Sequence, residues 1–322
     1  MKLSNLVIMF YITLLMVSCS KNDDATKTEQ KIETPNARQQ AINDYQNMFV
    51  AAKVNNFTWN GNTSNCTSGT LSKEVLDKAL LRLHYFRKAA GLSNNGIVFL
   101  NDLNNKSQQN ALMIKANNKL DHFPTSDWKC YTAEGAEAAR YGNIAFGLSD
   151  VDNIDLWIED EGSNNKEVGH RRWMLFSKAT NFGFGCTNSS GTLWVINSGA
   201  SKIPLPASTP KFIAWPPANF IPSAVVYPRW SFSIPVSSYP FQVDFSKATV
   251  SMTDAAGIAI PLLIEYANTI QSIYVGDNAI VWRPSGIKLN CKEDQKYKVN
   301  ISNVMVEGNP KNYWYEVTII NP

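Results

Sequence analysis

Residues 169–175 read Gly-His-Arg-Arg-Trp-Met-Leu, and they contain one of only three histidines in the chain. A second histidine lies in the string Leu-Asp-His-Phe-Pro at residues 120–124. Imidazole changes its charge near pH 7 and is the commonest metal ligand in proteins. Pro124 cannot continue a helix, so it helps to fix the turn that presents His122. If the fold brings His122 and His170 together, the two rings form a site for a metal ion or a polar ligand.

The residues that precede these motifs predict helices. Ser72 is a suitable N-cap, Glu74 suits the positive end of the helix dipole, and Gly91 is a good stop. An apolar stripe runs along the helix between them, and His84 lies off the centre of that stripe, at the surface or at its boundary. Further elements are expected as helices over residues 37–54, 102–118 and 151–160, a loop over 141–147, and two strands over 182–186 and 193–196.

The character of the sequence changes near residue 203, where prolines become frequent and helix signals stop. Apolar and polar residues then alternate over residues 230–236, which predicts a strand with one buried face. Short runs of this kind continue to residue 320 and favour an all-β sandwich. Four tryptophans of this region belong either to the core or to a surface that stacks on sugars, and two exposed neighbours would indicate the second: Trp215, Trp230, Trp282 and Trp314.

The N-terminus is typical of an exported protein. Lys2 precedes an apolar run over residues 6–17, which is short for a membrane span and suitable for a signal peptide. Residues 15–19, Leu-Met-Val-Ser-Cys, resemble a bacterial lipobox, which implies lipidation of Cys19 and a membrane anchor. Residues 20–24 resemble the acidic export tag of surface lipoproteins. We therefore expect a cell-envelope location, in the outer membrane and exposed at the surface; an ordinary signal peptide with an incidental Cys19 is the alternative.

Composition narrows the choice of partners. Hydrophobic residues are 44% and charged residues 18% of the chain, as in globular proteins. The net charge of +3 and the scattered basic residues give no reason to expect a nucleic-acid partner. An exported chain can form disulfides, and the four cysteines after Cys19 allow three pairings. Buried free thiols are the alternative for these four: Cys66, Cys130, Cys186 and Cys291.

Several strings in the middle of the chain share an order and spacing with one family. They are Arg87–Leu92, Gln109–Ala111, Leu120–His122, Gly142–Ala145, Trp157 and Gly169–Arg171. Residues 72–198 resemble a CAP domain, the SCP-like domain of cysteine-rich secretory, antigen 5 and pathogenesis-related proteins. The resemblance implies an αβα sandwich in which His122 and His170 face each other across a cleft. Bacterial relatives often append a β-sandwich, and residues 215–217 and 229–232 fit that arrangement.

The expected fold class is therefore α+β, with a CAP-type αβα sandwich followed by an all-β immunoglobulin-like sandwich. We expect the proline-rich junction to limit flexibility, so that the two parts pack together. The expected divisions are a lipoprotein signal peptide at 1–19, a flexible tether at 20–36, an N-terminal helix and loop at 37–71, the CAP domain at 72–200, and the junction with the β-sandwich at 201–322.

The acidic partners of the two histidines depart from the family pattern. Many CAP domains complete a tetrad with two glutamates, one inside a Gly-Glu-Asn string and one three residues after a helix tryptophan, and the string at residues 141–143, Tyr-Gly-Asn, has no glutamate at the first place. Here Glu137 is the nearest acid upstream of the first place, and Asp160 takes the second, after Trp157. The resemblance implies a mixed nitrogen and oxygen site for Zn²⁺ or a similar ion. Alternatively, these carboxylates and imidazoles only hydrogen-bond and fix the loops.

The function expected from these features is that of a membrane-anchored ligand-binding, adhesion or signalling module, whose partner is an unknown lipid, glycan, peptide or protein. A metal-assisted hydrolase of peptides or esters is the alternative, with His122, His170 and Asp160 as its catalytic residues. The sequence lacks a Gly-x-Ser-x-Gly elbow and a His-Glu-x-x-His helix, so enzymatic activity is the less favoured reading. The pair Arg171–Arg172 is expected to contact nearby carboxylates such as Glu159 and Glu161.

Overall fold

The computed structural model describes residues 37–237, 242–272, 275–289 and 292–322. The predicted signal peptide, the predicted lipidation site Cys19, the predicted tether and Cys291 lie outside these residues. The chain from Pro35 to Pro322 forms one compact unit. Within the described ranges, no helix combines the length and the apolar character that a membrane crossing requires.

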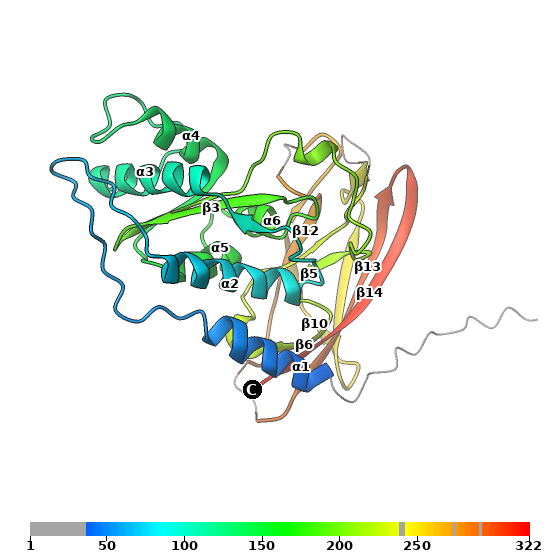
Figure 1. The fold of residues 1–322 in the computed structure, drawn as a ribbon. Coiled ribbons are helices and arrows are strands. Elements are labelled where there is room, and N and C mark those ends of the chain that lie inside the picture. Colours follow the sequence, from blue (N-terminus) through cyan, green and yellow to red (C-terminus); the bar gives the residue numbers. More distant parts are fainter. Residues whose placement is uncertain (1–36, 238–241, 273–274, 290–291) are drawn as a thin grey trace, which may run out of the picture. The chain divides into compact units, whose positions relative to one another are not determined.

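A small sheet lies at the centre of the first half of this unit. Its strand order is β1-β3-β4-β2, with β1 (Val98–Phe99), β3 (Asn181–Cys186), β4 (Ser190–Trp194) and β2 (Gly142–Phe146). One face is covered by α3 (Asn101–Asn117) and α4 (Ala133–Tyr141) (Figure 1). The other is covered by α2 (Lys73–Ala89), α5 (Asp152–Glu159) and α6 (Gly169–Met174) (Figure 1). The expected helix–sheet–helix layering is confirmed.

Glycines on the sheet allow the helices to approach closely. A Cβ atom on Gly183 would lie 2.4 Å from Cβ of Leu103, and one on Gly185 would lie 2.2 Å from the backbone nitrogen of Gln108. Both contacts belong to α3. On the opposite face, a Cβ atom on Gly191 would lie 2.6 Å from the side chain of Asn153 in α5. The glycine positions therefore set the spacing of both layers.

The helices expected from the sequence form, with small differences in their ends. The hydroxyl of Ser72 accepts from the Val75 backbone N–H at 3.3 Å, and Gly91 is left-handed with φ of 80°, so both ends of α2 are as predicted. The first predicted helix consists of α1 (Ala37–Asp44) and a π-helical turn, η1 (Tyr45–Val50). The prediction of a loop over 141–147 is wrong, because Gly142–Phe146 pairs along its whole length with β4.

A disulfide joins Cys66 to Cys130. This bond fixes the loop before α2 to the segment before α4, and it settles one of the pairings that the sequence left open. Cys186 is a buried free thiol on β3. Burial raises the pKa of this thiol above its usual value, which makes Cys186 a core residue rather than a nucleophile.

Two further sheets form the second half. The larger has the order β10-β9-β13-β14-β6, with β8 also paired to β13, and its pairs are antiparallel except β14 with β6. The smaller has the order β11-β12-β7-β5 and is antiparallel throughout. The strands of the larger sheet are β6 (Asn219–Pro222), β8 (Val243–Asp244), β9 (Thr249–Asp254), β10 (Ala259–Ile260), β13 (Gln295–Val306) and β14 (Asn309–Ile320). Those of the smaller are β5 (Ile213–Trp215), β7 (Trp230–Ser233), β11 (Leu262–Ala267) and β12 (Ala279–Pro284).

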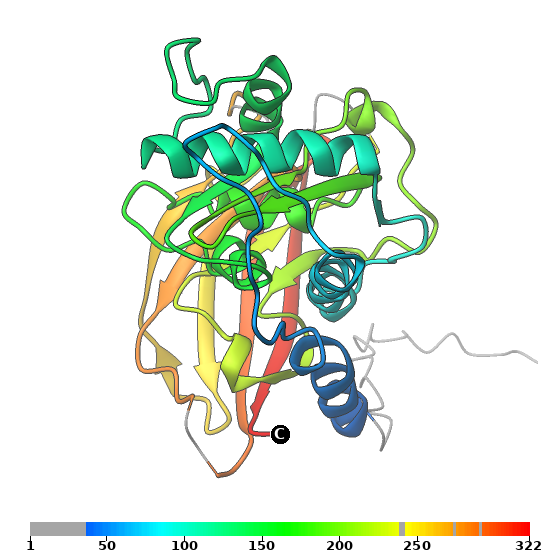
Figure 2. The ribbon, with the colours of Figure 1, turned by 60° about the vertical axis from the view of Figure 1, so that its left-hand side comes forward.

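The two sheets pack face to face through aromatic side chains. The ring of Trp230 lies 6.2 Å from that of Tyr297, and the ring of Phe232 lies 5.3 Å from that of Tyr313. Two short 3-10 turns lie in the connecting segments: Ala200–Lys202 precedes β5, and Ser223–Val225 lies between β6 and β7. Figure 2 shows α1 beside the strands of this half; Arg38 on α1 binds Asp294 at 2.8 Å. The chain has the expected α+β class.

The predicted pattern of one buried and one exposed face fails at β7. Ser231 and Ser233 are as buried as Trp230 and Phe232, because the second face of this strand meets the first half of the unit. The sugar platform of paired tryptophans is also wrong. Three of the four tryptophans are at most 1% exposed, and Trp314 alone among them is exposed, at 51%. Trp215, Trp230 and Trp282 are therefore core residues.

Candidate functional site

Asp160 and His170 form the best-defined pair among the predicted site residues. Asp160 follows α5 in the left-handed conformation, with φ of 55°, and its side chain is fully buried. One carboxylate oxygen lies 2.8 Å from Nδ1 of His170, and the other accepts from the His170 backbone N–H at 2.9 Å. An ionised carboxylate only accepts, so Nδ1 carries a proton, and in the neutral ring Nε2 is the acceptor. Because 24% of the His170 side chain is exposed, a solute can approach this ring.

His122 is held in a similar way by a backbone carbonyl. Its Nδ1 lies 2.6 Å from the backbone oxygen of Ala139 in α4, and a carbonyl also only accepts, so Nε2 is again the acceptor in the neutral ring. His170 is connected to the next element, since the Asn143 side-chain amide in β2 donates to the His170 oxygen at 3.1 Å. Ala139 and Asn143 are four residues apart, and four residues span at most about 14 Å. The α4–β2 junction therefore contacts the ring of His122 and the backbone of His170.

Glu137 is oriented toward a different partner. Its carboxylate lies 3.0 Å from Nζ of Lys106 in α3, and this hydrogen bond is the main reason that the pKa of Lys106 is raised. Asp160 is already hydrogen-bonded to His170. Among the described residues, no group of three or more His, Cys, Asp or Glu side chains lies together so that it could hold a metal ion. The two imidazoles therefore have no shared carboxylate ligand in this part of the chain.

Two buried arginines connect this site with the β-sandwich. Arg171 donates to the carbonyls of Ile158 at 2.6 Å and of Arg229 at 2.9 Å, and burial lowers its pKa to about 10, so it stays charged at neutral pH. Arg229, directly before β7, donates to the carbonyl of Asp160 at 2.7 Å and to that of Gly162 at 2.8 Å. The residue that orients His170 is thus held from the second half of the unit.

Glu265 on β11 completes this connection. Its carboxylate lies 2.5 Å from Nε of Arg229 and 3.5 Å from Nε of Arg283. Burial alone would raise the pKa of Glu265, but the hydrogen bond and the charge of Arg229, with those of Arg283, outweigh burial and hold the pKa below its usual value. The prediction that Arg171 contacts acidic side chains is wrong: a buried guanidinium here satisfies backbone carbonyls, including the one of Glu159. Arg172 donates from Nε to the carbonyl of Asp277, and its Nη1 lies 3.9 Å from the carboxylate of Glu167, so the predicted contact of the pair with a nearby carboxylate is present at Arg172.

Sequence reasoning missed three contributors to the site. Asn143 lies in a string that carried the family resemblance, but its bond to His170 was not predicted. Ala139 contributes only a carbonyl, which no side-chain pattern can reveal. Arg229 lies 69 residues after Asp160, and no local signal connects the two.

Comparisons with known proteins agree with the geometry for part of the chain. Residues 81–198 match the family model of the CAP domain, the cysteine-rich secretory protein family. A search of curated proteins finds no match to the chain. The matched residues include α3, α4, the small sheet, both site histidines and Asp160. CAP domains are in general ligand-binding modules of an extracellular type. Residues 81–198 of this chain are thus similar to a CAP domain.

Proposed function

We propose that this protein is a bacterial envelope lipoprotein whose CAP domain binds a ligand through His122 and His170. The observation that carries the proposal is the Asp160–His170 pair, in which a buried carboxylate fixes a partly exposed imidazole. A carboxylate that accepts from Nδ1 leaves Nε2 directed to an external partner, which is how metal-binding and ligand-binding histidines are commonly oriented. His122 repeats the same scheme with a carbonyl.

The anchor is part of the proposal. Lipidation of Cys19 would place the CAP domain outside the cytoplasm, in the outer membrane and exposed at the surface. Support comes from the Cys66–Cys130 disulfide, since disulfides form and persist in oxidising compartments such as the bacterial periplasm and the cell surface. Mass spectrometry of the purified protein tests the anchor. We expect a mature N-terminus at Cys19 that carries acyl chains, and none in Cys19→Ala.

A divalent ion such as Zn²⁺ remains a prediction for this site. The donor chemistry is suitable, because in the neutral rings both Nε2 atoms have a free lone pair, and imidazole nitrogen is a usual zinc ligand. His122 and His170 would hold the ion, and Asp160 would orient one ligand from behind. The ion would supply a Lewis-acid contact for an oxygen atom of the bound molecule.

Titration calorimetry with ZnCl₂ on the full chain in detergent tests the metal part. We expect one ion per chain, no binding in His122→Ala or His170→Ala, and an affinity roughly 10–100-fold lower in Asp160→Asn, as for other partners of metal-ligating histidines. His84→Asn is the matched control. The half-buried His84 is not a predicted ligand, and its Nε2 lies 3.0 Å from the backbone oxygen of Ile97. Absence of uptake, or equal uptake in His170→Ala, contradicts the metal assignment.

The alternative function is a metal-assisted hydrolase that uses the same residues. A carboxylate-aligned imidazole is the arrangement of a general base, so the Asp160–His170 pair favours this alternative too. Within the described ranges, however, no serine, threonine or cysteine side chain hydrogen-bonds to His170. Turnover of peptide or ester substrates by the wild type, abolished in His170→Ala and unchanged in His84→Asn, would establish the hydrolase.

A further inference from the structure

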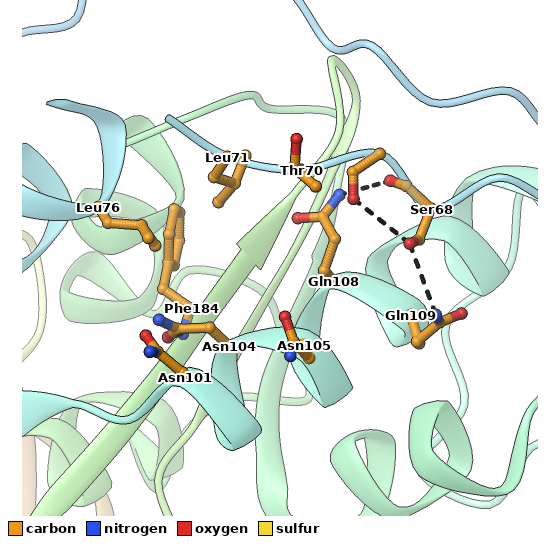
Figure 3. Close-up of a pocket in the computed structure, with 11 residues that line it drawn as sticks. Ser68, Thr70, Leu71, Leu76, Asn101, Asn104, Asn105, Gln108, Gln109 and Phe184 are labelled. Atoms are coloured by element: carbon orange, nitrogen blue, oxygen red, sulfur yellow. Dashed lines mark hydrogen bonds between the residues drawn. The ribbon is translucent and has the colours of Figure 1, made fainter. Parts of the chain in front are cut away.

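A polar pocket that neither site histidine lines lies over α3. It has a volume of about 550 Å³ and opens between the loop at residues 68–71, the start of α2, α3 and β3 (Figure 3). None of its lining residues carries a charge, and none is a site histidine or hydrogen-bonds to one. The lining consists of Ser68, Gly69, Thr70, Leu71, Leu76, Asn101, Asn104, Asn105, Gln108, Gln109 and Phe184.

Five of the lining side chains are amides, and they form two rows along α3. Residues four apart in a helix lie on the same face, which places Asn104 with Gln108 in one row. This inner row is buried, and most of its donors and acceptors are already used. Asn104 accepts from the Phe184 N–H at 2.8 Å, and Gln108 accepts from the Cys186 N–H at 3.0 Å and donates to the carbonyl of Ser68 at 2.8 Å. The inner row therefore joins α3 to β3 and to the loop.

The outer row consists of Asn101, Asn105 and Gln109, again at four-residue spacing. Asn101 and Asn105 are exposed, and their side chains make no hydrogen bond within the part of the chain that the structure describes. Gln109 makes one long contact, 3.5 Å from its amide nitrogen to the hydroxyl of Ser68 (Figure 3). Each of these amides presents a donor and an acceptor to the pocket. The outer row therefore keeps more hydrogen-bonding capacity than the inner row.

The loop that forms the opposite wall is fixed before any ligand binds. The indole N–H of Trp59 donates to the carbonyl of Ser68 at 2.8 Å, and the side-chain oxygen of Asn60 accepts from the Thr70 N–H at 2.8 Å. The Cys66–Cys130 disulfide attaches the same loop to the segment before α4. A wall that is already ordered costs little conformational entropy on binding.

We infer that this amide pocket binds a neutral carbohydrate. The absence of charge in the lining disfavours ions and charged headgroups. A sugar ring offers adjacent hydroxyls, each of which can donate and accept, to match the amides of the outer row. Its C–H face matches the half-buried Leu71 and Leu76. The volume lies within the range of small-molecule sites and accommodates one or two rings.

A peptide is the less suitable occupant. Extended peptides usually bind by adding a strand to a free sheet edge. Here the pocket contacts the sheet only at β3, and β3 is already paired with β1 on one side and β4 on the other. The loop at residues 68–71 carries no strand. A peptide would therefore find no backbone ladder to join.

Saturation-transfer NMR and calorimetry on the full chain test the inference, in a detergent without a sugar headgroup. The probes are glucose, galactose, N-acetylglucosamine and cellobiose, with an acetylated, amidated trialanine as the peptide comparison. We expect saturation transfer to at least one sugar and none to the peptide. Asn101→Ala/Asn105→Ala should weaken sugar binding at least 10-fold, since each lost hydrogen bond accounts for a several-fold change in affinity.

Two controls separate this pocket from the histidine site. Asn95→Ala removes another exposed amide, in the turn after α2, and should leave the sugar affinity unchanged. His122→Ala/His170→Ala should also leave it unchanged, so a failure of the metal experiment does not affect this one. Lack of transfer to every sugar, transfer to the peptide instead, or equal affinity in Asn101→Ala/Asn105→Ala would overturn the inference.

Discussion

Arg229 is the residue through which the β-sandwich acts on the histidine site. Replacement by Met keeps much of the apolar stem but removes the hydrogen bonds to Asp160 and Gly162 and leaves Glu265 buried with a weaker partner. Breaking a buried ion pair from one side costs about 3–5 kcal/mol. We expect Arg229→Met to lower the free energy of unfolding by that amount, as measured by urea denaturation.

The same variant should also alter the site. Because the Asp160 carbonyl loses its donor, the His170 imidazole resonances should shift in NMR spectra of the folded protein. Lys298→Met, a change of a surface cation near Trp314, is the control and should alter neither quantity. A stability within 1 kcal/mol of wild type, together with unshifted His170 signals, would contradict the role given to Arg229.

Asp277 should make stability depend on pH. Complete burial raises the pKa of this carboxyl to about 6, although Ser177 donates two hydrogen bonds to it. The pKa of an aspartate in the unfolded chain is about 3.9. Because the pKa of Asp277 is higher in the folded state, the folded state binds the proton more tightly. Protonation therefore stabilises the folded state below about pH 4, and this stabilisation is lost as the pH rises through about 6. A pKa difference of about two units between the folded and unfolded states corresponds to roughly 3 kcal/mol in the free energy of unfolding.

Asp277→Asn isolates this contribution, because an amide keeps the shape and can bond Ser177. The free energy of unfolding of the wild type should fall relative to that of the variant between pH 4 and 6, by roughly 2–3 kcal/mol. Urea denaturation at several pH values measures the difference. Parallel profiles for the two proteins would show that Asp277 does not titrate in this range.

At the scale of elements, Gly185 determines how closely α3 packs on β3. A methyl group there would lie 2.2 Å from the backbone nitrogen of Gln108, and a backbone atom cannot rotate away. We expect Gly185→Ala to cost about 3 kcal/mol, the upper range for overpacked cores. Gly169→Ala is the matched control, since its nearest neighbours lie at 3.5 Å and its helix would gain from alanine. Thermal unfolding of both variants distinguishes a packing requirement from a general effect of glycine replacement.

The elements that could be predicted from sequence are those with local signals. Ser72, Gly91 and the apolar stripe between them identify α2, because these signals all depend on residues within or next to that one helix. The outer amides Asn101 and Asn105 explain why the apolar periodicity of α3 is modest: this face borders a polar pocket instead of the core. Gly142–Phe146 could not be recognised as a strand, since its pairing partner, β4, lies far along the chain.

The same distinction applies to the site. His122, His170 and Asp160 could be selected from short strings and a family resemblance, and the structure pairs Asp160 with His170. Glu137 was chosen by proximity in sequence, yet a side chain on α4 meets Lys106 on α3 instead. Ser231 was expected to be exposed, but the Arg171 side chain covers that face of β7. These outcomes depend on tertiary contacts, which local patterns do not contain.

At the scale of the molecule, the core and the polar contacts cross the boundary that the sequence suggests near residue 200. One hydrophobic cluster contains residues of both halves, and the ring of Phe86 in α2 lies 5.3 Å from that of Trp215 in β5. Ser177, after α6, bonds Asp277 at 2.8 Å. Separating the halves would leave buried charges such as Arg171 without partners, at a cost of several kcal/mol each.

We therefore expect the two halves to unfold as one cooperative unit. Calorimetry of the full chain should give a single transition whose calorimetric and van't Hoff enthalpies agree. Residues 201–322 expressed alone should show no cooperative transition, because β7 would expose the face that Arg171 and α6 cover in the whole protein. Arg171→Met should lower the single transition temperature without splitting it, since the lost bonds to Arg229 and Ser231 stabilise both halves together. Two separate transitions, with the upper one unaffected by Arg171→Met, would mean that the β-sandwich folds independently and that the histidine site does not depend on it.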